Sequence, residues 1–110
     1  MATIFKGYYA VNISNSSMTT LYTAPSLTVS SLTSVILSNK LGASGTVSVQ
    51  VVRSGGINTT NVVTNAPIPA GGAMDVIINK PIVLNAGDYI QAQASAASMS
   101  DATISVMEQS

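Results

Sequence analysis

The sequence of 110 residues contains no cysteine, no histidine and no tryptophan. The absence of thiols excludes disulfides and thiol nucleophiles, and the absence of imidazoles excludes the usual zinc sites and histidine-based acid–base catalysis. Charged residues are also scarce, at 7% of the chain against about 25% in an average globular protein. The four basic and four acidic residues are scattered, so they do not make the basic stripe that binds nucleic acid.

Long hydrophobic runs are missing as well. No apolar stretch approaches the roughly 20 residues that a membrane helix requires. The opening residues, MATIFKGYYAVN, lack the basic region followed by an apolar run that marks a signal peptide. We therefore expect synthesis and first folding in a cytoplasm, and no membrane as a partner.

Hydroxyl side chains replace the missing charges. About a quarter of the residues are Ser or Thr, so the outward faces are expected to carry hydroxyls, amides and alanines. Such a surface costs less to desolvate than an ionic one, because burying an unpaired charge costs far more than burying a hydroxyl that finds a partner. This composition favours a subunit whose surface is covered by other subunits. The alternative is a soluble domain with a serine-rich exterior.

The stretch from Val35 to Val52 predicts two apolar strands joined by a polar, glycine-bearing loop. In its second arm valines alternate with Ser48 and Gln50, the two-residue period of a half-buried strand. Its first arm, 35–37, is apolar at consecutive positions and is expected to have protein on both faces. We interpret the stretch as a hairpin at the centre of a β-sandwich.

Two further segments carry predictions about their faces. In the expected strand 3–13, Phe5, Tyr9, Val11 and Ile13 form the more apolar set and are expected to face the core. Beyond the turn Asn85–Asp88, alanines at 92, 94 and 96 form one face of a strand. Their small size predicts that a bulky group or another backbone lies close to that face.

The complete pattern predicts roughly seven to nine short strands at spacings near ten residues, and no stretch has a convincing 3.6-residue period. The expected fold is all-β, a single antiparallel β-sandwich of Ig-like or jelly-roll-like type. Residues 1–110 are expected to form one domain.

No catalytic, cofactor-binding or metal site is expected. Asp75, Asp88 and Asp101 stand singly near turns or strand edges, without the spacing of a calcium loop, and are expected to stabilise turns. The glycine pairs 55–56 and 71–72 match no phosphate-binding motif. Serines are abundant, but none has a histidine or a convincing lysine to activate it. Enzyme activity is therefore not expected.

Three tyrosines allow two interpretations. Tyr8, Tyr9 and Tyr22 could form part of a sugar-binding platform, or they could be packing residues in strands. We favour packing.

Five segments together resemble small β-sandwich accessory proteins of tailed bacteriophage virions, which include head decoration (cement) proteins and tail or fibre adaptors. The resemblance covers most of the chain, although each motif is short. It rests on LYTAPSL (21–27), SSLTSVILSNK (30–40), SGTVSVQVV (44–52), IVLNAGDYIQAQASAA (82–97) and ATISVMEQ (102–109).

The resemblance implies a non-enzymatic virion protein, assembled in the host cytoplasm. We expect a capsid decoration protein that forms a homo-oligomer such as a trimer, through sandwich edges or the alanine face. It would bridge subunits of the major coat protein and stabilise the shell. The alternative is a tail or fibre adaptor that binds host glycans through loops 55–61 and 66–73. A host β-domain unrelated to any phage is a third hypothesis.

Overall fold

The computed structural model describes residues 3–53, 58–77 and 81–109. Within these ranges there are nine strands and no helix, so none that is long and apolar enough to cross a membrane. The strands are β1 (Thr3–Ala10), β2 (Thr19–Thr23), β3 (Val29–Ser38), β4 (Gly45–Arg53), β5 (Asn58–Ile68), β6 (Ala73–Asp75), β7 (Ile82–Leu84), β8 (Tyr89–Ala94) and β9 (Ala102–Gln109).

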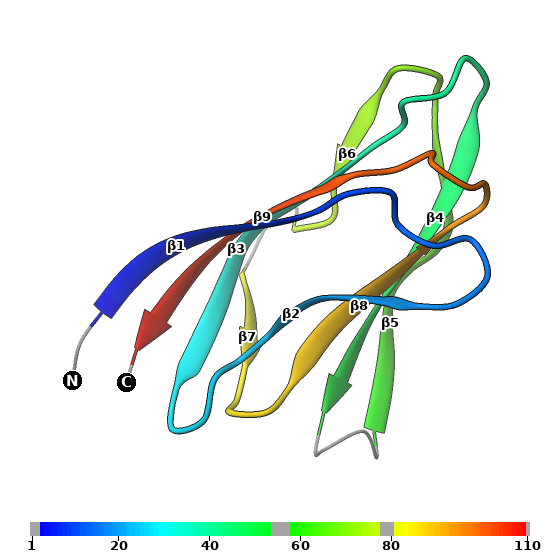
Figure 1. Cartoon of the computed structure of the whole chain (residues 1–110). Coiled ribbons are helices and arrows are strands. Elements are labelled where there is room, and N and C mark those ends of the chain that lie inside the picture. Colours follow the sequence, from blue (N-terminus) through cyan, green and yellow to red (C-terminus); the bar gives the residue numbers. More distant parts are fainter. Residues whose placement is uncertain (1–2, 54–57, 78–80, 110) are drawn as a thin grey trace.

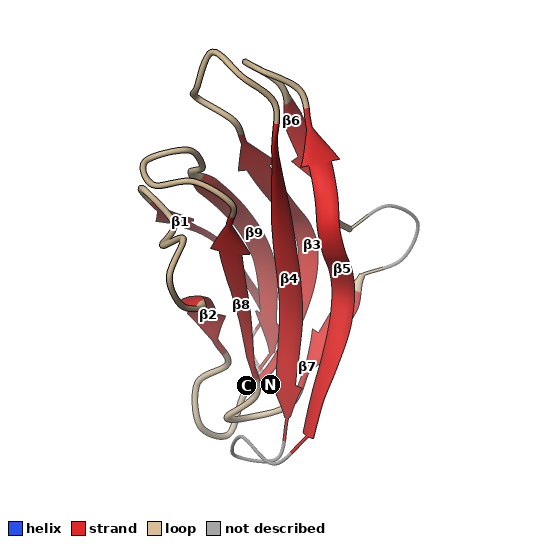
Figure 2. Ribbon diagram, turned by 90° about the vertical axis from the view of Figure 1, so that its right-hand side faces the viewer, coloured by secondary structure: helices blue, strands red, loops and turns tan. Residues whose placement is uncertain are grey.

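The strands form two antiparallel sheets that pack face to face (Figures 1 and 2). Sheet A has the order β1-β9-β3-β6, and β7 also pairs with β3. Sheet B has the order β2-β8-β4-β5. The predicted all-β sandwich and its number of strands are confirmed.

The pairings are nested along the chain. Strand β1 pairs with β9, β2 with β8, β3 with β6 and β7, and β4 with β5. The first described residue, Thr3, thus lies opposite Gln109, and Arg53 lies opposite Asn58. Pairing of β9 with β3 and of β8 with β4 then completes the two sheets. This order is that of a jelly roll, which decides between the two predicted types of sandwich.

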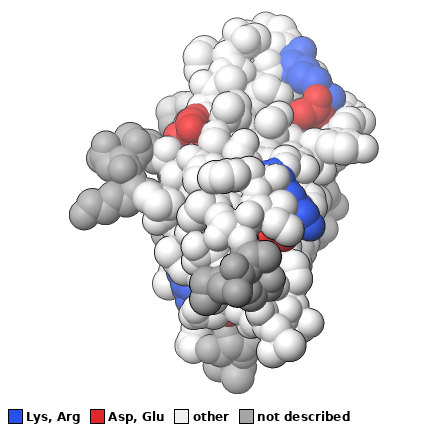
Figure 3. Space-filling model, turned by 90° about the vertical axis from the view of Figure 1, so that its left-hand side faces the viewer, with Lys and Arg blue, Asp and Glu red and all other residues white. Residues whose placement is uncertain are grey.

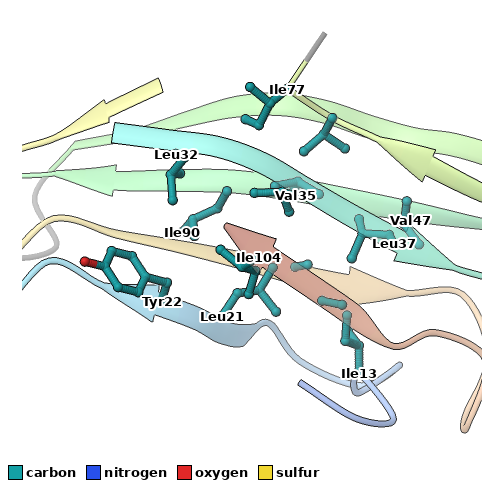
Figure 4. Close-up of a cluster of buried hydrophobic side chains, with 14 of the residues drawn as sticks. Ile13, Leu21, Tyr22, Leu32, Val35, Leu37, Val47, Ile77, Ile90 and Ile104 are labelled. Atoms are coloured by element: carbon teal, nitrogen blue, oxygen red, sulfur yellow. The ribbon is translucent and has the colours of Figure 1, made fainter. Parts of the chain in front are cut away.

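The core lies between the sheets and consists of the inward residues of both (Figure 4). Leu32, Val35 and Ile104 from sheet A meet Val49 and Ile90 from sheet B, all of them fully buried. Each such side chain contributes about 1.5–3 kcal/mol by leaving water. An ordinary aliphatic core therefore holds the sandwich together without disulfides.

The alanine face of β8 belongs to this core. Ala92 and Ala94 are buried among the larger side chains of the hydrophobic cluster between the sheets. The predicted close approach is thus made within the chain itself. It follows that this face is not exposed and is not a contact surface for a second copy.

The predicted hairpin between the arms of 35–52 is wrong. Strand β3 lies in sheet A and β4 in sheet B, so the connection 39–44 crosses from one sheet to the other. Asn39 holds this crossing: its side-chain amide donates to the carbonyls of Ala43 at 2.9 Å and Ile68 at 3.0 Å, and its Oδ1 accepts from the Leu41 amide at 2.9 Å. Two apolar strands around a polar loop look alike in both arrangements, because the pattern fixes strands and not their partners.

The predicted inward face of β1 is also wrong, except at its end. Phe5, Tyr9 and Val11 are exposed, and only Ile13, beyond the strand, is buried. The inward side of β1 instead carries Lys6 and its neighbours at alternate positions, since Lys6 lies opposite the buried Val106. β1 is an edge strand, where an inward-pointing charge is tolerated.

Candidate functional site

Six of the seven charged residues that the structure describes form three ion pairs. The first pair joins β1 to the end of β9 on the inward side of sheet A. The second joins the loop after β3 to the residue before β9, and the third joins the end of β4 to the turn before β8. These ion pairs are Lys6–Glu108 at 3.3 Å, Lys40–Asp101 at 2.9 Å and Arg53–Asp88 at 3.1 Å. Lys80 lies outside the described residues.

Glu108 is a buried carboxylate on the inward side of β9. Its Oε2 accepts hydrogen bonds from the hydroxyls of Tyr22 at 2.5 Å and Tyr8 at 3.1 Å. The hydrogen bond from Tyr22, supported by those from Lys6 and Tyr8, lowers the pKa of Glu108 although burial opposes this. Burial, followed by the contact with Glu108, raises the pKa of Tyr22. Because Tyr22 belongs to sheet B and Glu108 to sheet A, the cluster ties the two sheets together.

The tyrosines do not form a shared platform. The rings of Tyr8 and Tyr22 pack against each other with centroids 4.8 Å apart, whereas Tyr9 is on the opposite side of β1 and is 79% exposed. The packing interpretation is confirmed for Tyr8 and Tyr22. Tyr9 has a different role, considered below.

Asp75 and Asp101 accept hydrogen bonds from backbone amides, most of them distant in the sequence. Asp75 accepts from the amides of Val35 at 3.2 Å and Ile77 at 2.9 Å. The Asn12 amide and then the Lys40 ammonium lower the pKa of Asp101. Among the described residues there is no group of three acidic, His or Cys side chains that could hold a metal ion.

The outer side of sheet A is poor in charge and rich in large apolar side chains, and we call it the apolar face. Exposed fractions are 76% for Phe5, 79% for Tyr9, 46% for Val83 and 38% for Ile36. The register places these residues in two rows across the sheet. The rows are Phe5–Met107–Ser31–Val83 and Tyr9–Thr103–Ile36–Asp75.

Between and beside these rows lie Gly7, Ser105 and Val29. Two acidic residues are at the margins: Asp75 at the β6 edge, and Asp101, which precedes β9 and is paired with Lys40. Figure 3 views the molecule from this side, which is white over most of its area. Exposed large apolar residues that gather on one face, rather than singly, mark interaction sites. Protein on both faces was predicted for residues 35–37, but within the described residues Ile36 stays 38% exposed.

The outer side of sheet B is chemically different, and we call it the amide face. Gln91 donates to Gln50 at 2.9 Å, and Gln50 donates to Asn61 at 3.0 Å, which makes a row of amides across β8, β4 and β5. Next to this row is a groove of about 210 Å³. It is lined by Asn15, Thr46, Ser48, Asn65, Gln93, Ala94 and Ser95.

The loops predicted to bind glycans are largely strand. Residues 55–57, with the glycine pair 55–56, lie outside the described residues, whereas 58–61 and 66–68 belong to β5. Pro67 fits there because β5 is an edge strand, where a missing amide donor costs no ladder hydrogen bond. Residues 69–72 form a turn in which the Gly72 amide donates to the Pro69 carbonyl at 2.9 Å and Gly71 has a φ of +71°.

Comparison with known proteins gives little. No protein-family model matches the chain, and no curated protein matches it. A solved structure, that of the Gx strain of infectious bursal disease virus, is similar at 16% identity and a TM-score of 0.41. The similarity covers 96% of this chain and 28% of the viral chain, so this chain spans under a third of its length.

Proposed function

We propose that this protein is a non-enzymatic virion component, a capsid decoration protein that binds coat subunits through its apolar face. The observation that supports this most directly is that four large apolar residues are exposed on the outer side of sheet A. Phe5 and Val83 are in one row across the sheet, and Tyr9 and Ile36 are in the other. A jelly roll occurs in viral capsid proteins but also in lectins and cupins. The fold therefore permits this function without selecting it.

The chemistry of the apolar face suits a protein partner. Aromatic residues are enriched at the centres of protein interfaces and charges are depleted there, which matches a face with Phe5 and Tyr9 and with Asp75 only at its edge. The molecule measures 46 × 27 × 23 Å, so a broad side can supply the roughly 800 Å² per partner of a standard interface.

The partner that we propose is the coat lattice. A shell presents the same binding surface many times. An oligomer of this protein would contact several coat subunits at once, so its overall affinity would exceed that of each single contact. Self-association is proposed through the sandwich edges β1 and β5, since the alanine face is interior. The resemblance of the sequence to phage accessory proteins supports the same partner.

The test is a binding assay with particles that lack the protein. Purified protein is expected to sediment with them, and Phe5→Asp to lose binding by roughly tenfold or more, because a charge would be buried at the interface. The matched control is Thr20→Asp, which places the same charge on the outer side of sheet B, in β2 and away from the edges β1 and β5.

Equal binding by both variants would contradict the role of the apolar face. A monomer that does not bind such particles would contradict the decoration function. Imaging that located the protein on a tail or fibre would replace it with the adaptor alternative.

A further inference from the structure

We infer that the groove on the amide face binds a neutral carbohydrate, with one sugar ring seated on β4, β5 and β8. This inference goes beyond the proposed function and does not depend on it. The two faces are on opposite sides of the sandwich (Figures 2 and 3). The groove thus remains open when the apolar face is covered.

The groove is built by a specific irregularity of the sheet. Val47 pairs with Ala66 and Val49 with Val63, so Ser48 alone lies opposite two residues of β5. Such a bulge redirects a side chain. Here it places Asn65, which has a left-handed φ of +48°, beside Ser48.

Hydrogen bonds then fix the walls of the groove. The Asn65 amide donates to Ser48 Oγ at 2.9 Å. From the other side, Gln93 Nε2 donates to the carbonyl of Asn15 at 3.0 Å, and Ser95 Oγ accepts from the Thr46 amide at 2.9 Å. A lining whose side chains are already held loses little conformational entropy when a ligand binds.

The groups that remain are the ones that a sugar needs. Among the described residues, no hydrogen bond engages Gln93 Oε1, Asn65 Nδ2 or the Thr46 hydroxyl. Gln93 Oε1 is a hydrogen-bond acceptor, Asn65 Nδ2 is a donor, and the Thr46 hydroxyl can donate or accept. Neighbouring hydroxyls of a sugar need such a mixed set of partners. None of the lining residues is charged, so the ligand expected is a neutral one.

The size and position of the groove favour a sugar over a peptide. Its volume of about 210 Å³ is below the roughly 300–1,000 Å³ of sites for drug-sized ligands, which fits a single ring. A peptide that binds as an added strand needs a free sheet edge. Most of the groove lies over β4 and β8, which have strands on both sides, so their backbone groups are used within the sheet. Of the edge strand β5 only Asn65 lines it, through its side of the bulge.

The expected affinity of one site is low. No aromatic ring lines the groove, so stacking against the sugar is absent, and the dissociation constant is expected at about 1 mM or weaker. Many copies on one particle would raise the effective strength by avidity.

The experiment is a titration of the isotope-labelled full chain with neutral sugars, followed by amide chemical shifts. Glucose, galactose, mannose and N-acetylglucosamine are the probes, and N-acetylneuraminate is the charged comparison. At least one neutral sugar is expected to shift the signals of Ser48, Asn65 and Gln93. Thr46→Val, which keeps the shape of the side chain, and Gln93→Ala are each expected to weaken binding roughly fivefold, the effect of one hydrogen bond.

The matched control is Gln91→Ala, on the same face of β8 but outside the groove, which is expected to bind as the original protein does. The inference is overturned if no neutral sugar shifts these signals at concentrations well above the expected dissociation constant. A preference for N-acetylneuraminate, or for a neutral peptide, overturns it as well. Sugar binding and particle binding are measured on different faces, so the failure of one is distinguishable from the failure of the other.

Discussion

The hydroxyl of Tyr22 donates a 2.5 Å hydrogen bond to Glu108 Oε2 across the interior of the sandwich. Both residues are buried, at 5% and 7% exposure, and the same hydroxyl lies 2.7 Å from Ser30 Oγ. A buried carboxylate needs such partners, because removing one leaves part of its charge unsatisfied. The contact therefore links β2, β9 and β3 at one end of the molecule.

Tyr22→Phe is expected to lower the free energy of unfolding by about 2 kcal/mol, because the ring packing is kept while a hydrogen bond to a charged group is lost. Chemical denaturation of both proteins measures the difference. Thr20→Val, on the exposed side of β2, is the control and is expected to change stability by less than about 0.5 kcal/mol. A loss no larger in Tyr22→Phe than in the control would contradict the importance of this contact.

Acid is expected to weaken the same cluster. The pKa of Glu108 is lowered in the folded state, chiefly by the Tyr22 hydrogen bond, so the unfolded chain binds its proton more readily. The stabilisation is complete above the ordinary glutamate pKa of about 4.3 and is lost as the pH falls through the lower, folded-state pKa. In Glu108→Gln the free energy of unfolding is expected to depend less on pH below about pH 4 than in the original protein. Denaturation at a series of pH values measures this. An unchanged acid dependence would show that other carboxylates dominate it.

Gly45→Ala is expected to destabilise the fold by about 1–3 kcal/mol. A Cβ at Gly45 would stand 2.8 Å from Met99 Cε and 3.0 Å from Ser95 Oγ, and Met99 is fully buried. Gly42→Ala is the matched control, since a Cβ there meets nothing within 4 Å, and it is expected to be neutral or slightly stabilising. Thermal unfolding measures both. A second change, Met99→Val, is expected to recover part of the loss in Gly45→Ala, and no recovery would mean that the clash is not with this side chain.

Asn39→Ala is expected to cost about 3 kcal/mol, because it leaves the carbonyls of Ala43 and Ile68 and the amide of Leu41 without their partner. Asn61→Ala removes one exposed hydrogen bond to Gln50 and is expected to cost less than about 0.5 kcal/mol. Denaturation curves compare the two. Similar losses would indicate that the crossing between the sheets is held by its backbone alone.

Binding to particles is expected to depend little on ionic strength. Among the described residues, the charges on the outer side of sheet A are few: Asp75 is at the β6 edge, and Asp101 near the start of β9 is paired with Lys40, so screening has little to act on. Between about 0.05 and 0.5 M salt the dissociation constant is expected to change by less than about twofold, measured by co-sedimentation. A tenfold weakening at high salt would indicate that ion pairs, rather than the apolar face, hold the protein to its partner.

The strands and the sandwich could be predicted from the sequence because alternation of apolar and polar residues fixes which residues are extended and which side they bury. The partners of the strands could not. A six-residue connection such as 39–44 is compatible both with a hairpin and with a crossing between the sheets. One hydrogen bond that holds the crossing joins Asn39 to Ile68, far along the chain, so local sequence does not reveal it. The face of β1 was misjudged because at an edge strand the more apolar side need not be the buried one.

The apolar face did leave a signal. The triplets Val35-Ile36-Leu37 and Ile82-Val83-Leu84 are apolar at three consecutive positions, so in a strand the middle residue must point away from the other two. Ile36 and Val83 both lie on the outer side of sheet A. The groove left none, because it depends on a bulge opposite Ser48 that no local pattern of Ser, Thr and Asn distinguishes from an ordinary strand.

The nested pairing also sets when the chain can fold during translation. Strand β9 lies between β1 and β3, so β1 gains no neighbour in its sheet until β9, the last described strand, has been synthesised. Until then its Phe5 and Tyr9, and the valines of β4, are exposed to other nascent chains. We expect folding to be slow, as it is for proteins dominated by distant contacts, and to be completed only after β9 is available. Truncation before Ala102 is expected to give an insoluble product.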